Sequence, residues 1–164
     1  MASKILYDIR DNSIIRCQAE PKGSARMPSI EGLCRSARVP DNELEYMDTL
    51  VIDKNMLTKH AKGQLRVVGI DGTTTVKIKP TVKITPSTTE LTVNSVLTID
   101  INIQNILSID NITSVDMRIN DVNFAIDVVD GGGSMDIELQ EVDTYTIECV
   151  DDRFMSNPVE VEVV

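Results

Sequence analysis

The chain has 164 residues, of which 41% are apolar and 26% charged, and its formal net charge is −10. This composition is typical of a folded globular protein with one ordinary domain or two small ones. No apolar run reaches the roughly 18 residues of a membrane span, and the first residues, MASKILYDIRDN, lack the apolar core of a signal peptide, so we expect a protein that is neither secreted nor membrane-inserted.

The cysteine and histidine content limits the chemistry that the chain can carry. Its three cysteines are widely spaced and form no CxxC pair, which excludes a dense disulfide framework and a cysteine-based zinc site. A single histidine, His60, leaves no multi-histidine metal site. A glycosidase built on two carboxylates is the enzymatic alternative, but the chain has no tryptophan and few aromatic residues to stack on sugars. We expect no cofactor and no enzymatic activity.

The charge is distributed unevenly along the chain. Residues 1–80 hold 13 basic and 10 acidic residues, a net charge of +3, whereas residues 81–164 hold 3 basic and 16 acidic residues, a net charge of −13. Such a split favours two units that face different surroundings. The acidic half repels nucleic acid and anionic lipid, so we expect neither as a partner, and the basic half suits an acidic partner.

Two short segments begin the predicted N-terminal domain, residues 1–79. Residues 4–9 and 13–18 flank an Asp11-Asn12 turn signal and predict a hairpin. After an irregular loop, Ser29 is a candidate N-cap of a helix that residues 39–41 end. The apolar stripe of this helix has i, i+3, i+4, i+7 spacing and consists of Ile30, Leu33, Cys34 and Ala37. Cys34 is therefore interpreted as a small buried apolar side chain.

The rest of this domain is predicted as two more short helices and a hairpin. Asp41 is a candidate cap for a helix that carries Leu44 and Met47. Asp53 is a candidate cap for a third helix, which Gly63 ends as the C′ residue and whose last turn places His60 near the negative end of the helix dipole. Residues 64–70 and 74–79 alternate around Asp71-Gly72, a strong hairpin signal. We expect a small α+β domain.

Basic residues gather around the first predicted helix. They are Lys22, Arg26, Arg35 and Arg38, and the last two lie three apart, so that they share a helix face away from the apolar stripe. Arginine forms bidentate pairs with carboxylates. Because no aromatic residues are interleaved with these cations, we expect them to bind an acidic protein surface rather than nucleic acid.

A segment bounded by two prolines joins the two halves. Pro80 and Pro86 enclose the sequence TVKIT, and proline restricts both its own φ angle and the residue before it. Residues 80–86 are therefore predicted to form a short, stiff linker that runs into the first strand of the second domain, residues 81–164.

The C-terminal half predicts an all-β sandwich. Apolar and polar residues alternate with period 2, as in half-buried strands. The alternating segments are residues 82–84, 97–103, 115–119, 124–128, 135–139, 145–149 and 159–163. About seven short strands in a domain of this length is the pattern of a β-sandwich.

The many aspartates of this half suggest calcium as an alternative to a solvated surface. Calcium requires several oxygen ligands that converge in one place, but the strand aspartates alternate singly and are expected to point outward. They are Asp100, Asp116, Asp127 and Asp136. Asp151-Asp152, in a predicted loop, is the one place at which a cation could be held.

The penultimate predicted strand resembles strand F of an immunoglobulin-like domain. Asp143, Tyr145 and Cys149 match the D-x-Y-x-x-x-C pattern around a tyrosine corner, in which the tyrosine hydroxyl binds the backbone upstream. The inward positions of the expected strand B hold Leu97 and Ile99, so that Cys149 has no disulfide partner there. The half thus resembles the disulfide-free immunoglobulin-like modules of bacteria and phages.

Together, the two predicted domains resemble a head decoration protein of tailed bacteriophages. The resemblance implies that residues 1–79 anchor on the major capsid protein and that the immunoglobulin-like domain projects from the virion, stabilises the shell and attaches weakly to surface glycans. It also implies a monomer that is made in the host cytoplasm. A phage tail or baseplate accessory, or a bacterial surface adhesin module, remains the alternative.

Overall fold

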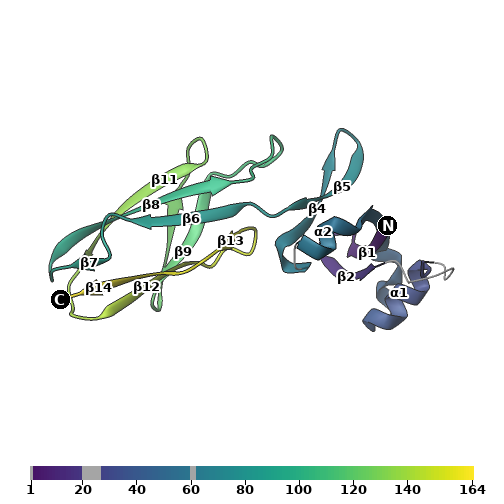
Figure 1. Ribbon diagram of the computed structural model, residues 1–164, viewed down its shortest axis with the longest axis horizontal. Helices are drawn as coiled ribbons and strands as arrows, with labels where there is room; N and C mark the ends of the chain where they lie inside the picture. Colours follow the sequence, from purple (N-terminus) through teal and green to yellow (C-terminus); the bar gives the residue numbers. More distant parts are fainter. Residues whose placement is uncertain (1, 20–26, 60–61) are drawn as a thin grey trace. The chain divides into compact units, whose positions relative to one another are not determined.

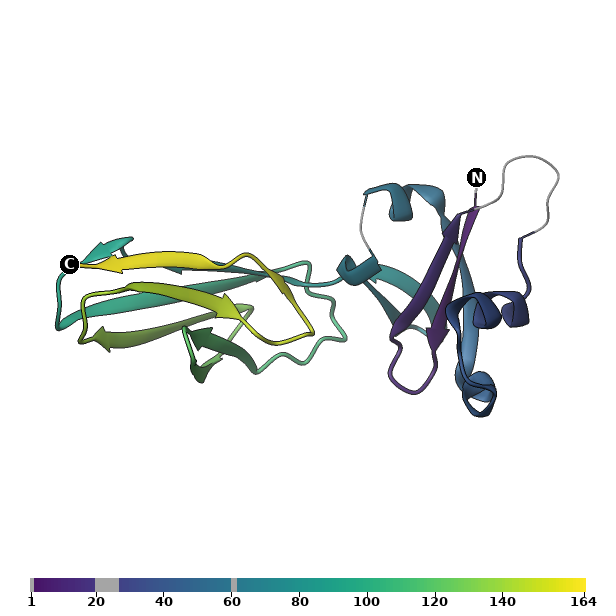
Figure 2. The ribbon, with the colours of Figure 1, turned by 90° about the horizontal axis from the view of Figure 1, so that it is seen from below.

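The computed structural model describes residues 2–19, 27–59 and 62–164, and the chain divides into two compact units, Met1–Ile78 and Lys79–Val164. Figures 1 and 2 show helices only in the first unit, whereas the second is built from strands. Within the described ranges, every helix is too short or too polar to cross a lipid bilayer.

A three-stranded antiparallel sheet is the centre of the first unit. Its order is β2-β1-β3, formed by β1 (Ala2–Asp8), β2 (Ile14–Ala19) and β3 (Met47–Asp53). The predicted β1–β2 hairpin is confirmed, and its turn contains Asn12 with φ 60°. Both faces of the central strand, β1, are covered: Ile5 and Tyr7 belong to one apolar cluster, and Leu6 belongs to another.

Helix α1 (Ile30–Ala37) covers one face of this sheet. The Oγ of Ser29 accepts a hydrogen bond from the backbone N–H of Gly32 at 3.2 Å, so the predicted N-cap is confirmed. Leu33 and Cys34 are buried against Leu6 and Met47. Burial also raises the pKa of the Cys34 thiol, as expected for a side chain that serves as a packed apolar group.

The segment after α1 differs from the prediction of a second α-helix. Residues Asp41–Tyr46 form a 3₁₀ helix, η1, for which Pro40 rather than Asp41 is the N-cap residue. Met47 is not on a helix but begins β3, where it is buried beneath α1. The spacing of Leu44 and Met47 fits an α-helix as well as it fits a 3₁₀ helix followed by a strand. Only the pairing of β3 with β1 decides between these two structures.

The third predicted helix is present but shorter than expected. Asp53 precedes α2 (Lys54–Lys59), and its carboxylate accepts a hydrogen bond from the N–H of Asn55 at 2.8 Å. Gly63 does not serve as a left-handed C′ residue, because it lies inside the 3₁₀ turn η2 (Lys62–Gln64). The expected position of His60 falls outside the residues that the structure describes.

A second hairpin, β4 (Leu65–Ile70) and β5 (Thr73–Ile78), completes the first unit. Asp71 and Gly72 both have positive φ angles, 50° and 75°, which is the conformation that a two-residue type I′ turn requires. The predicted hairpin is thus confirmed, and its Leu65, Val67 and Val76 pack with Ile5 and Tyr7.

Two sheets form the second unit, and nine strands contribute to them. One sheet has the order β11-β8-β6-β13 and the other the order β10-β9-β12-β14-β7. The strands are β6 (Thr81–Pro86), β7 (Glu90–Leu91), β8 (Ser95–Gln104), β9 (Ser114–Ile119), β10 (Val122–Asp127), β11 (Gly132–Leu139), β12 (Thr144–Cys149), β13 (Met155–Ser156) and β14 (Val159–Val163).

This strand order is that of an immunoglobulin-like sandwich. With β6 as strand A, the sheets read E-B-A and C′-C-F-G, and β12 occupies the expected position of strand F. Leu97 and Ile99 of β8 and Ile147 of β12 are completely buried between the sheets. The prediction of an all-β, immunoglobulin-like C-terminal fold is therefore confirmed.

The prediction of a linker over residues 80–86 needs correction. Residues 81–86 are not a connection but strand β6, which pairs with β8 along its whole length, from Thr81 opposite Gln104 to Pro86 opposite Ile99. Only Lys79 and Pro80 lie between β5 and β6. Proline is tolerated at the end of β6 because this strand is paired along its whole length on one side only.

Candidate protein-binding surface

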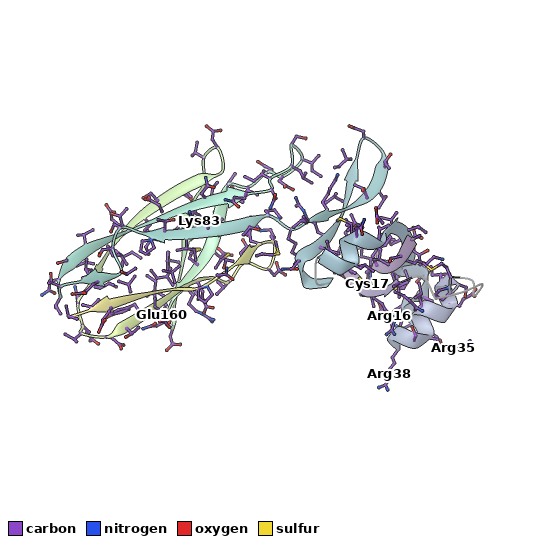
Figure 3. All side chains as sticks on the ribbon, viewed as in Figure 1. Arg16, Cys17, Arg35, Arg38, Lys83 and Glu160 are labelled. Atoms are coloured by element: carbon purple, nitrogen blue, oxygen red, sulfur yellow. The ribbon has the colours of Figure 1, made fainter. Side chains whose placement is uncertain are left out.

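Three arginines gather around the C-terminal end of α1, and we refer to them as the arginine cluster. Arg35 lies in the last turn of the helix, Arg38 follows the helix, and Arg16 reaches it from β2. All three side chains are exposed, and Figure 3 shows Arg38 extending away from α1. Cations at this end of a helix are favoured by the partial negative charge of the free carbonyls.

Arg16 is positioned by the register of the hairpin. It lies opposite Leu6 in the β1–β2 pair, and Leu6 packs beneath α1. Because opposite residues in a pair share a face of the sheet, Arg16 points to the helix side. Its Nη1 donates a hydrogen bond to the carbonyl of Ser36 at 3.1 Å.

Arg38 ends the helix in a way that the sequence did not indicate. Its φ of 58° is left-handed, a conformation that glycine usually supplies. The N–H of Arg38 donates to the carbonyl of Arg35, and that of Val39 donates to Cys34, which is the bonding pattern of a Schellman motif. The expected common helix face of Arg35 and Arg38 is therefore wrong, since Arg38 has left the helix.

The guanidinium groups of the arginine cluster are exposed, although that of Arg16 also donates to the carbonyl of Ser36. Among the residues that the structure describes, no carboxylate lies within ion-pair distance of any of them. Arg10 is the contrast, because it pairs with Asp8 and Glu43 and stacks over Tyr46 with 4.3 Å to the ring centroid. The arginine cluster can thus receive an acidic surface without first breaking an internal ion pair.

The structure brings together only part of the predicted basic group. Arg35 and Arg38 are near each other, whereas Lys22 and Arg26 lie outside the described residues. Arg16 was absent from the predicted group because its proximity depends on the register between β1 and β2. From the alternation of residues 13–18 alone, Arg16 could lie on the same face of the sheet as Ile14 or on the opposite face. A one-residue shift in the β1–β2 pairing, between Leu6 and Tyr7, decides between the two faces.

In the sandwich, the residues of the immunoglobulin-like resemblance have structural contacts. The Oη of Tyr145 donates a hydrogen bond to the carbonyl of Glu141 at 3.2 Å, as in a tyrosine corner. The carboxylate of Asp143 accepts from the N–H of Thr144 at 2.7 Å. The carbonyl of Pro80 accepts from the N–H of Met155 at 2.9 Å, and Pro86 ends β6.

At the candidate cation position, Asp151-Asp152, the carboxylate of Asp151 already has a cationic partner. Arg153 binds both carboxylate oxygens of Asp151, with Nη2–Oδ2 at 2.6 Å and Nε–Oδ1 at 2.9 Å. Burial is the largest single influence on the pKa of Asp151 and acts to raise it, but the charge and hydrogen bonds of Arg153, with a backbone bond from Asp116, together lower the pKa. A cation would have to displace Arg153, so this position is corrected to an internal ion pair.

The other sites of metal or thiol chemistry considered from the sequence are not assembled. Within the described ranges, no three or more His, Cys, Asp or Glu side chains converge on a point that could hold a metal ion. The strand aspartates are exposed as predicted: Asp100, Asp116, Asp127 and Asp136. None of the three cysteines is in a disulfide bond, and burial raises the pKa of Cys149.

Comparisons with known proteins add little to this description. No family model and no curated protein matches the chain. It is similar to a structure of Clostridium thermocellum CbhA fibronectin(III)-like modules, with 15% identity, a TM-score of 0.38, and coverage of 98% of this chain and 76% of that one. It is also similar to a β-glycosidase from Bacteroides vulgatus, with 11% identity, a TM-score of 0.35, and coverage of 98% and 21%. These scores are too low to support an argument, so the fold assignment rests on the strand order.

Proposed function

We propose that the protein is a non-enzymatic structural protein of a virus particle that decorates the outer surface of a tailed-bacteriophage capsid. In this proposal the first unit binds the lattice of the major capsid protein, and the acidic sandwich projects into solvent. Binding to the assembled lattice stabilises the shell, because a ligand that prefers one state raises the population of that state.

One observation carries the proposal: three exposed arginines of the first unit have no carboxylate partner among the residues that the structure describes, whereas residues 81–164 carry a net charge of −13. Electrostatic complementarity steers association and fixes register at an interface. An acidic capsid surface would attract the arginine cluster and repel the sandwich, and so it would orient the protein with the sandwich outward. Arginine is suited to this role because its planar fork binds a carboxylate through two hydrogen bonds.

Sedimentation with purified, empty phage capsids tests the proposal. We expect the full chain to pellet with capsids and the variant Arg35→Glu with Arg38→Glu to bind roughly a hundredfold more weakly, because charged pairs across an interface are replaced by repulsion. A matched control, Lys77→Glu with Lys83→Glu, makes the same change in net charge at exposed positions elsewhere and should retain binding.

The outcomes separate the parts of the proposal. A chain that does not pellet with capsids contradicts capsid decoration itself. Equal losses in both double variants would assign binding to net charge rather than to the arginine cluster. Circular dichroism of each variant identifies a loss that comes from unfolding.

A further inference from the structure

The outer edge of β3 is a long, regular strand edge that pairs with nothing in the described part of the chain. β3 pairs with β1 over all seven of its residues, from Met47 opposite Asp8 to Asp53 opposite Ala2, and no described strand pairs with its other side. Proteins usually protect such edges with a bulge, a proline, charged side chains or a very short strand. The strand MDTLVID has an uninterrupted register and no proline, and its charged residues, Asp48 and Asp53, flank an uncharged stretch from Thr49 to Ile52.

The backbone groups at this edge follow from the alternation of hydrogen bonds in the sheet. The N–H of Ile9 donates to the carbonyl of Tyr46 at 2.8 Å, so Ile9 faces β3 and every second residue of β1 does the same. The β3 residues opposite them bond inward, and those in between direct N–H and C=O outward. Thr49 and Val51 are therefore the outward residues.

Val51 is the open position of this edge. The outward N–H of Thr49 is covered by the carboxylate of Asp48, which accepts its hydrogen bond at 2.6 Å. This hydrogen bond shows that the N–H of Thr49 is not bonded to β1, as the alternation of hydrogen bonds along β3 also indicates. The side chain of Val51 is 61% exposed, more than that of any other large apolar residue of the first unit.

An open groove of about 300 Å³ runs beside this edge. Residues of β3 form one wall of the groove and residues of β5 form the other. Within the described ranges, each of these two strands pairs with a single neighbouring strand. The lining side chains are mostly apolar or β-branched: Leu50, Val51, Ile52, Met56, Thr74, Thr75 and Val76, with Asp53 as the charged member.

We propose that this groove binds an extended segment of another protein, which adds an antiparallel strand to the free edge of β3. Backbone bonds to Val51 supply affinity that is independent of sequence, and alternate side chains of the segment enter the groove beside Leu50 and Ile52. β-Branched residues suit these alternate positions because they pack well on a pleated surface. This surface is separate from the arginine cluster, so the inference does not depend on capsid binding.

Charge determines which kind of segment fits. Asp48 and Asp53 stand at the two ends of the open stretch, so a segment with a basic residue opposite each of them is favoured. A second copy of this chain is disfavoured, because two chains that each carry a net charge of −10 repel one another.

The test uses the full ¹⁵N-labelled chain and the peptide acetyl-KVTVTK-amide. In antiparallel register its lysines face Asp53 and Asp48, and its valines face Ile52 and Leu50. We expect saturable NMR shifts in the amides of residues 49–53 and 74–76 and slower hydrogen exchange at the Val51 amide. The charge-reversed peptide acetyl-EVTVTE-amide should bind about tenfold more weakly, since each like-charge contact opposes pairing.

Two variants separate edge pairing from contact with the side chain of Val51. Val51→Pro removes the outward N–H and leaves the bonds to β1 intact, because proline is tolerated at an edge whose N–H faces solvent. It should weaken peptide binding about tenfold or more, the effect of a lost hydrogen bond, whereas Val51→Thr keeps the N–H and should bind normally. Unshifted amides at 49–53, or binding unchanged in Val51→Pro, would overturn the inference. A dimer of the free chain that Val51→Pro dissociates would assign the edge to self-association instead.

Discussion

Arg153 connects the loop that follows β12 to the first residue of β9. Besides its bonds to Asp151, its Nη2 donates to the carbonyl of Ser114 at 3.1 Å, and its guanidinium lies 5.3 Å from the ring centroid of Phe154. The Asp151 side chain is only 6% exposed, so its charge depends on this partner. At the residue scale, a pair of this kind fixes the loop more than it adds stability, because desolvation offsets much of the attraction.

Replacing the carboxylate of Asp151 should change how the stability of the protein depends on pH. Because the folded pKa of Asp151 is lowered, its stabilisation is complete above the unfolded value of about 4 and is lost as pH falls through the folded pKa. We expect Asp151→Asn to lower the free energy of unfolding by about 1 kcal/mol at pH 7 and by progressively less in acid. Urea unfolding at several pH values measures this. The neighbouring Asp152→Asn is the control, and an equal loss there would contradict the assignment.

At the element scale, the close approach of β10 and β11 depends on one glycine. A Cβ built on Gly133 would lie 2.3 Å from the carbonyl oxygen of Asp127 and 2.8 Å from the Cγ2 of Ile126. The carbonyl oxygen of Asp127 belongs to the backbone, so no side-chain rotation can relieve this contact. The glycine at this position is therefore a packing requirement, and it allows the two sheets to come together at the edge where β10 meets β11.

A single methyl group should accordingly force β10 and β11 apart. Gly133→Ala is expected to reduce the free energy of unfolding by about 2 kcal/mol, as overpacking does in close-packed regions. Gly69→Ala is the matched control, because it is also a strand position and a Cβ there meets no atom within 4 Å; its effect should stay within about 0.5 kcal/mol. Chemical denaturation of both variants measures the two free energies of unfolding. An equal loss in both would show that the contact at Gly133 relaxes without cost.

The elements that the sequence predicted well are those defined by local signals. The period-2 segments of the sandwich, the Ser29 cap and the Asp71-Gly72 turn each need only a few neighbouring residues to specify them. β3 was missed because its strand conformation depends on pairing with β1, some 45 residues earlier. For the candidate site, charge alone pointed to Arg35 and Arg38, whereas Arg16 required the register of a hairpin. The groove beside β3 depends on three separate elements and has no local signature.

At the scale of the whole molecule, the dominant feature of the second unit is its uncompensated negative charge. Of its few cations, Arg118 pairs with Glu148 at 2.5 Å and Arg153 pairs with Asp151. The acidic residues include a direct conflict, because Glu162 of β14 lies opposite Glu90 of β7. Like charges at directly opposite positions oppose strand pairing. The excess of negative charge on the sandwich also opposes its association with a second copy.

Removing one member of that pair should stabilise the protein in a manner that salt abolishes. We expect Glu162→Gln to raise the free energy of unfolding by about 0.5 kcal/mol at low ionic strength and to have no effect near 1 M salt, where the screening length is about 3 Å. Glu148→Gln is the comparison, since it breaks an ion pair with Arg118 and should give no gain. Thermal unfolding at both salt concentrations is the measurement, and a gain that persists at high salt would rule out repulsion as its cause.

The two end strands of the sandwich also determine how it responds to mechanical force. β6 begins at the end where the chain enters the second unit, and β14 finishes at the opposite end, as Figure 1 shows. β6 is bonded to β8 over six residue pairs, and β7 runs parallel to β14. Tension applied between Lys79 and Val164 would load these bonds in shear, because they stand across the direction of pull. Bonds in shear break together rather than one after another, so the sandwich should resist stretching far better than its modest size suggests.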